Sequence, residues 1–178
     1  YNIGQRSFGE NKIQDMSDKV HSLAHLPLEW HFIGRLQTNK INQLIDLNPF
    51  LMHSLSSLEL AMELDKRLHV KGKKLSTLLQ INSAYEEQKA GVLPQEALEI
   101  YEQITSTCKN INLKGVMSIG AHSEDEKIIQ KSFETTYKIC EVLERKGAKY
   151  CSMGMSGDFE VAVHCGSNML RLGSILFQ

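Results

Sequence analysis

A stretch near the end of the sequence, Ser152 to Ser174, has the residue types and spacing of a phosphate-binding site. It holds two small-residue turns, Gly154–Asp158 and Gly173-Ser174, and each follows a short apolar run. Glycine lets backbone N–H groups approach a ligand, and the start of a helix offers unpaired N–H donors to an anion. The same pattern is also typical of an ordinary loop that ends in a helix N-cap, so both interpretations stand at this point.

Arg171 adds a positive charge beside the second turn. Strand alternation in M-L-R-L-G sends the two leucines to one face and Arg171 to the other. Because a buried charge without a partner is unfavourable, the guanidinium needs one. A carboxylate, Asp158 or Glu160, would satisfy it, and so would a bound ligand.

The composition is that of a globular domain and excludes several classes of protein. The chain has 178 residues, 42% of them hydrophobic and 23% charged, which predicts a single domain over residues 1–178 with one core. Twenty basic residues against 21 acidic ones give no footprint for nucleic acid or for an anionic membrane. No segment approaches the roughly 18 apolar residues of a membrane span. Four cysteines are too far apart for a metal site or a C-x-x-C redox pair, and we interpret them as reduced core residues of a cytoplasmic protein: Cys108, Cys140, Cys151 and Cys165.

Short apolar runs alternate with helical patterns along the whole chain. The predicted strands are Ser7–Gly9, Trp30–Gly34, Phe50–Ser54, Leu75–Asn82, Leu113–Ile119, Lys149–Met153 and Met169–Leu172. The predicted helices are Asn11–His25, Asn39–Leu47, Ser56–Val70, Pro94 to about Cys108, Ser123–Lys146 and Asp158–Cys165. Such β-α repetition predicts a parallel sheet covered by helices.

An open doubly wound sheet and a (β/α)8 barrel both fit this alternation. Barrels normally need roughly 200 to 250 residues, so this chain is short by about one βα unit. The two phosphate-like turns follow the last two predicted strands, where barrels commonly bind phosphate. We therefore expect an α/β (β/α)8 TIM barrel that lacks its first strand, with a gap between Ser7–Gly9 and Met169–Leu172.

In a barrel the ligand site lies at the carboxyl ends of the strands, so the residues that close each run are the candidates. Asn11 is one, either as a ligand contact or as the N-cap of the next helix. His31 is weaker, because a buried histidine bonded to the backbone is the commoner arrangement. No Ser/His/Asp triad, carboxylate pair or P-loop can be made from these positions, and no lysine ends a predicted strand.

Four motifs carry a resemblance to a known family. They are F8-G9-E10-N11, the run W30-H31-F32-I33-G34-R35-L36-Q37-T38-N39-K40, S152-M153-G154-M155-S156-G157-D158-F159-E160 and R171-L172-G173-S174. In this order, over nearly all of the chain, they resemble the pyridoxal-phosphate homeostasis family, the YggS-like proteins. The resemblance implies a barrel like the N-terminal domain of alanine racemase, with pyridoxal 5′-phosphate at the strand ends.

The resemblance also implies roles for particular residues. Phosphate contacts would come from Ser156, Gly157, Gly173 and Ser174, with Arg171 facing the pyridine nitrogen and Asn11 near the ring. An arginine there keeps the nitrogen unprotonated, which weakens the ring as an electron sink and suits a carrier. The family's Schiff-base lysine is expected upstream of Tyr1, outside this sequence.

The resulting expectation is a non-catalytic protein that buffers and delivers pyridoxal phosphate. It would be a cytoplasmic monomer, and PLP-dependent apoenzymes would be its partners. One alternative is a PLP-dependent racemase or decarboxylase of the same barrel type. Another is a cofactor-free barrel enzyme that acts on a phosphorylated metabolite.

Overall fold

Seven parallel strands form one sheet, and their order in the sheet is their order along the chain. The structure is a computed structural model that describes residues 1–177. The strands are β1 (Ser7–Glu10), β2 (Glu29–Phe32), β3 (Leu51–Leu55), β4 (Leu75–Ile81), β5 (Ile111–Ser118), β6 (Tyr150–Met155) and β7 (Met169–Arg171). A doubly wound sheet reverses its strand order at a switch point, and this sheet does not. The barrel expectation is therefore confirmed.

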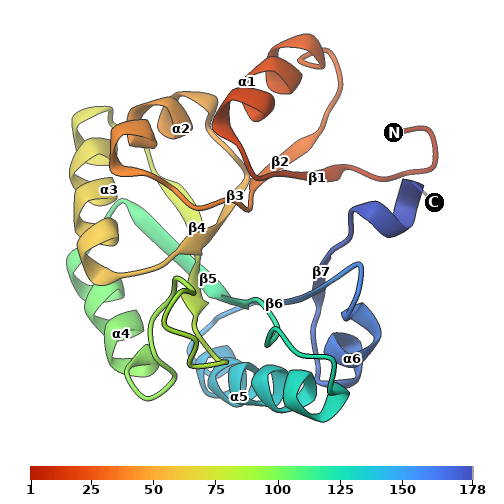
Figure 1. Ribbon diagram of the computed structural model, residues 1–178. Helices are drawn as coiled ribbons and strands as arrows, with labels where there is room; N and C mark the ends of the chain where they lie inside the picture. Colours follow the sequence, from red (N-terminus) through yellow and green to blue (C-terminus); the bar gives the residue numbers. More distant parts are fainter. Residues whose placement is uncertain (178) are drawn as a thin grey trace.

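The barrel is open along one side. Every neighbouring pair from β1–β2 to β6–β7 is hydrogen-bonded in parallel, and no pairing joins β1 to β7 within residues 1–177. Figure 1 shows the curved sheet with its helices outside and the opening between β1 and β7, beside the two chain ends. The expected gap between the first and last strands is confirmed.

The helices lie on the outside of the sheet and follow the predicted alternation (Figure 1). They are α1 (Ile13–Ser22), the 3-10 turn η1 (Thr38–Lys40), α2 (Ile41–Leu47), α3 (Leu58–Val70), α4 (Ala97–Thr107), α5 (Glu126–Glu144), α6 (Phe159–His164) and the 3-10 turn η2 (Ser174–Phe177). α5 shows why these segments are helical, because its buried Phe133, Cys140 and Leu143 recur at helical spacing. Their burial against the sheet fixes the helix on the barrel.

Strand alternation divides the apolar core into two layers. Side chains on the outer face of the strands, such as Phe32, Met52 and Val116, join the large cluster under the helices. Leu51, Leu78 and Met117 form a separate small cluster, which we place inside the barrel. The inner faces of β2, β3, β6 and β7 carry polar side chains as well, and these build the site.

Candidate functional site

The two predicted turns meet in space at the carboxyl ends of β6 and β7. The Ser156 hydroxyl oxygen accepts the backbone N–H of Gly173 at 3.0 Å and that of Ile175 at 3.4 Å. Two donors from the second turn therefore converge on one oxygen of the first. Within residues 1–177, the backbone N–H groups of Gly157 and Ser174 have no acceptor. This concentration of donors is the geometry that an oxyanion requires.

Two glycines of these turns border open space. A Cβ built on Gly157 or Gly173 meets no atom within 4 Å, and neither backbone has a positive φ in the left-handed range. Gly154 differs, because its φ is +92° and an added Cβ would lie 2.6 Å from that of Ala162. The fold therefore requires glycine at position 154. At positions 157 and 173 the fold would accept a side chain, and only a ligand that approaches the backbone closely would require glycine there.

Arg171 lies on the inner face of β7 and is anchored by uncharged groups. Its Nη1 donates to the Ser152 hydroxyl at 2.6 Å, and its Nη2 donates to the Ser118 carbonyl at 2.8 Å. Burial lowers the pKa of Arg171 to about 10, against a smaller opposing effect of the Asp158 charge. The guanidinium therefore stays protonated at neutral pH.

Neither Asp158 nor Glu160, the two carboxylates that could have paired with Arg171, forms an ion pair with it in the described chain. The Asp158 carboxylate instead accepts the Met155 backbone N–H at 2.6 Å. Ser152 and the Ser118 carbonyl come from β6 and β5, and the sequence alone does not reveal their distance from β7. A guanidinium has five N–H donors, so three remain for a ligand.

A buried chain of polar side chains extends from Arg171 across the barrel interior. Ser152 Oγ lies 3.1 Å from His53 Nδ1, and His53 Nε2 lies 2.9 Å from His31 Nδ1. Burial is the main cause that lowers the pKa of His53, to about 3, and the nearby His31 and Arg171 lower it further. Both imidazoles are therefore neutral at pH 7, since burial also lowers the pKa of His31.

His31 was expected to be buried and bonded to the backbone, and the expected partner is wrong. His31 is buried, but its Nδ1 faces another histidine rather than the backbone, and its Nε2 has no partner in the described chain. Sequence reasoning missed His53 altogether. The signal was available, because L-M-H-S-L places His53 in strand phase with Leu51 on an otherwise apolar run.

Asn11 lies just beyond β1 and does not cap α1. The N-cap of that helix is Lys12, and the Asn11 side chain makes no hydrogen bond within residues 1–177. Glycine at position 34 lets the Asn11 backbone lie this close, since a Cβ there would lie 1.8 Å from the Asn11 carbonyl oxygen. The amide of Asn11 is exposed and available at the strand ends.

A cavity of about 250 Å³ opens at the ends of β3, β4 and β5. It is lined by Ile33, Arg35, Ser54, Gln80, Ile81, Asn82, Gln88, Lys89, Ala90, Met117 and Ile119. Both charged residues in this lining, Arg35 and Lys89, are basic, which suits an anionic ligand. Lys89 was not a sequence candidate, because it lies in a loop; its ammonium donates to the Gly120 carbonyl at 2.8 Å and to Glu86 at 2.7 Å.

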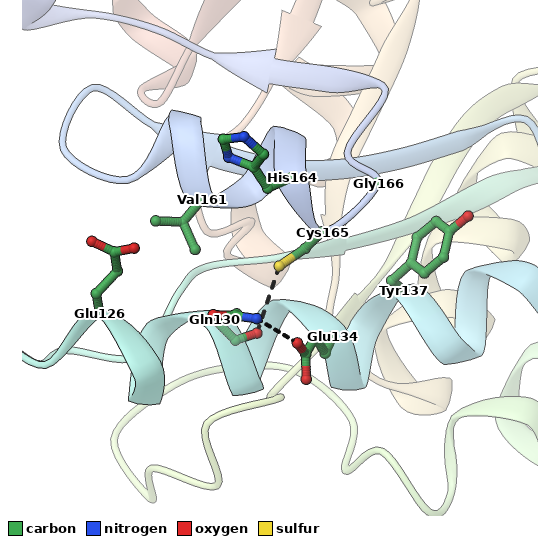
Figure 2. A pocket seen from close by; sticks show the side chains of 8 residues that line it. All are labelled: Glu126, Gln130, Glu134, Tyr137, Val161, His164, Cys165 and Gly166. Carbon is green, nitrogen blue, oxygen red and sulfur yellow. Dashed lines mark hydrogen bonds between the residues drawn. The ribbon is translucent and has the colours of Figure 1, made fainter.

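A second hollow lies outside the barrel, between α5 and α6. Figure 2 shows this groove of about 410 Å³, lined by Glu126, Gln130, Glu134, Tyr137, Val161, His164, Cys165 and Gly166. Two carboxylates and no lysine or arginine line it, so it does not suit a phosphate. Cys165 is half-buried and packs against the edge of the core, whereas Cys108, Cys140 and Cys151 are buried in it.

Comparisons with known proteins agree with the sequence resemblance. The family model for the N-terminal domain of alanine racemase matches residues 4–178. The pyridoxal phosphate homeostasis protein of Helicobacter pylori is 60% identical over 178 residues, which is all of this chain and 79% of that protein. Within the part of the chain that the structure describes, no helix is both long and apolar enough to span a membrane.

Solved structures give the same picture. PipY of Synechococcus elongatus, with PLP bound, is 30% identical with a TM-score of 0.85, covering 100% of this chain and 84% of that one. Alanine racemase of Clostridium difficile has a TM-score of 0.82 at 18% identity, covering 99% of this chain and 46% of that one, which shows a shared fold alone. The chain therefore belongs to the alanine racemase N-terminal domain family and, within it, to the pyridoxal phosphate homeostasis proteins.

Proposed function

We propose that this protein binds pyridoxal 5′-phosphate and that it buffers and delivers the cofactor without robust catalysis. The observation that carries this proposal is the donor cluster at the two turns. The Gly173 and Ile175 N–H groups orient the Ser156 hydroxyl, whose own proton stays free to donate. Beside it the N–H groups of Gly157 and Ser174 have no acceptor in the described chain, and open space borders Gly157 and Gly173. Binding of PLP by the related PipY supports the choice of ligand.

The residues present fit this cofactor. The phosphate would be held by Ser156, Gly157, Gly173 and Ser174, whose backbone and hydroxyl donors match its oxygens. Arg171 keeps three N–H donors after anchoring to Ser152 and Ser118, and one of them would meet the pyridine nitrogen. Asn11 would contact the ring through its free amide. When bound, the cofactor supplies an aldehyde that reacts with amines and a ring that withdraws electrons.

The carrier role follows from what Arg171 can and cannot do. With a pKa of about 10 it remains a donor at neutral pH, so it offers the pyridine nitrogen a hydrogen bond and leaves it unprotonated. An unprotonated nitrogen withdraws fewer electrons from a substrate carbon. The naming of the Helicobacter pylori relative as a homeostasis protein supports the same conclusion. The racemase or decarboxylase alternative, and the cofactor-free barrel enzyme, have no observation in their favour.

Further parts of the proposal concern the whole protein. The covalent link would be made by the family's Schiff-base lysine, which the resemblance implies upstream of Tyr1. Residues 1–178 would belong to one barrel domain. The protein would act as a cytoplasmic monomer that passes the cofactor to PLP-dependent apoenzymes, and three buried free cysteines fit a reducing compartment.

The proposal is tested on the full-length protein by absorbance titration with PLP and with pyridoxal, which lacks the phosphate. We expect tight binding of PLP, and binding of pyridoxal weaker by about 100-fold, because charged hydrogen bonds at the two turns are lost. Equal affinity for both ligands would contradict the phosphate cradle. Amino-acid racemisation is measured in parallel; robust turnover that Arg171→Ala abolishes would replace the carrier by the racemase alternative.

A further inference from the structure

The hydrogen bonds around Arg171 have a direction that chemistry fixes. A guanidinium can only donate, so Ser152 Oγ accepts from Arg171 Nη1 at 2.6 Å. The hydroxyl then has one proton left to donate. We assign this proton to His53 Nδ1, which lies 3.1 Å from Ser152 Oγ, so that Ser152 donates and His53 Nδ1 accepts.

The direction propagates through both histidines. With Nδ1 accepting, a neutral His53 carries its proton on Nε2 and donates it to His31 Nδ1 at 2.9 Å. His31 in turn carries its proton on Nε2, which is the buried atom without a partner. This arrangement gives each of the three contacts from Arg171 to His31 one donor and one acceptor, and it leaves the His31 Nε2 proton without a partner among the described residues.

Burial makes this arrangement persistent. His53 is 1% exposed and Ser152 is fully buried, and the four members of the chain come from β2, β3, β6 and β7. Away from water, a lost hydrogen bond is not replaced, and bonds in a chain strengthen one another. A hydroxyl that donates to His53 is a better acceptor for the guanidinium.

We propose that His53 and His31 are positioning residues that hold the Arg171 guanidinium through Ser152 and so set its contact with the pyridine nitrogen of bound PLP. This inference rests on the proposed function and goes beyond it, since neither histidine touches the cofactor in this role. The alternative is that the two imidazoles only fill the barrel interior.

Variants of full-length protein separate these roles through the absorption spectrum and the release rate of bound PLP. We expect His53→Phe and Ser152→Ala to shift the absorption maximum in the same direction as Arg171→Ala and to release PLP about tenfold faster. His53→Asn keeps an acceptor near the Nδ1 position, so its spectrum should stay close to wild type. Thr77→Val is the control, because Thr77 is equally buried and its hydroxyl has no partner in the described chain; its spectrum should not change.

A second measurement needs no variant and is insensitive to folding losses. In ¹⁵N-histidine NMR of the full-length protein, both rings should be neutral with the proton on Nε2. A proton on Nδ1 of His53 would overturn the chain.

The failures are distinguishable. If wild type does not bind PLP, the proposed function fails and the positioning role falls with it. If wild type binds PLP and Arg171→Ala shifts the spectrum, but His53→Phe and Ser152→Ala leave it unchanged, the positioning role alone is wrong.

Discussion

The barrel interior and the groove between α5 and α6 are two polar regions that differ in almost every respect that matters for a ligand. The groove is the larger hollow, at about 410 Å³ against about 250 Å³ for the cavity at the strand ends. Its lining is acidic, and two side-chain hydrogen bonds join its residues, from Gln130 to Glu134 and from the Cys165 thiol to the Gln130 carbonyl (Figure 2). The interior holds a buried arginine–serine–histidine chain that ends beside the two turns.

Volume alone therefore does not identify a ligand site. An anion needs donors that are already oriented and a positive or neutral surround, because groups that must reorganise on binding lose free energy. Ser156 and the turn at Gly173 supply oriented donors, whereas Glu126 and Glu134 would repel a phosphate. The account therefore predicts that equal changes in the two regions have unequal effects on PLP binding.

The largest effect is expected from a negative charge placed in each region. Ser156→Glu fills the donor cluster with a carboxylate, so PLP affinity of the full-length protein should fall by at least about 100-fold while circular dichroism stays native. Gln130→Glu makes the same change of charge in the groove and should leave PLP affinity unchanged. Loss of binding in the groove variant, or retention in Ser156→Glu, would reverse the assignment of the site.

Removal of Arg171 is expected to have the next largest effect. In full-length protein, Arg171→Ala should weaken retention of PLP by about 10- to 100-fold, because a charged hydrogen bond is worth about 1.5–3 kcal/mol, and should shift the absorption maximum. The covalent link should survive, since it depends on another residue. The free energy of unfolding should also fall, by about 1–3 kcal/mol, because Ser152 and the Ser118 carbonyl lose their partner. An unchanged spectrum with reduced stability would mean that Arg171 serves the fold alone.

Two glycines of the turns at the strand ends should differ in what they contribute to binding and to stability. Gly173→Ala puts a methyl group into open space, so it should lower PLP affinity about tenfold and change the free energy of unfolding by less than about 0.5 kcal/mol. Gly154→Ala is the matched control, with a left-handed backbone and a clash at 2.6 Å, and should cost about 2–4 kcal/mol of stability. Chemical denaturation of the apo protein and PLP titration measure the two effects. A destabilised Gly173→Ala with normal affinity would show that the fold requires that glycine.

The pH dependence of stability reports on the buried histidines. In the folded protein the pKa of His53 is lowered from 6.5 to about 3, so below pH 6.5 the unfolded chain binds a proton that the folded chain does not. As the pH falls from about 6 to about 4, His53 should therefore lower the free energy of unfolding by about 1.4 kcal/mol per pH unit. The free energy of unfolding, measured with urea at several pH values, should depend less steeply on pH in His53→Asn than in wild type. The same pH dependence in both proteins would mean that the folded state accommodates a charged His53.

The sequence was sufficient to predict the type and order of the elements, but it did not predict the exact bounds of the strands. Apolar runs separated by helical patterns predict all seven strands, and the central ones are buried on both faces, as Leu51–Leu55 is throughout. The third strand was placed one residue too early, at Phe50–Ser54 instead of Leu51–Leu55, and Phe50 is in fact 46% exposed. β6 also extends through Gly154 and Met155, which were assigned to the turn.

Part of the site could also be predicted from the sequence, and part could not. The meeting of the turns at Ser156 and Gly173 follows from barrel topology, which brings the ends of neighbouring strands together. The partners of Arg171 do not follow, because they depend on how far β7 is staggered against β6 and β5. Strand phase with Leu51 could have placed His53 inside the barrel, but its contact with His31 could not be predicted, because it depends on the stagger of β3 against β2.

A structure of the full-length protein with PLP bound would show where the phosphate lies. We expect it at the two turns, with its oxygens about 2.7–3.2 Å from the Ser156 hydroxyl and from the backbone N–H groups of Gly157 and Ser174. We also expect the Arg171 guanidinium at the pyridine nitrogen, still bonded to Ser152. A phosphate bound instead beside Arg35 and Lys89, or in the groove between α5 and α6, would contradict the account.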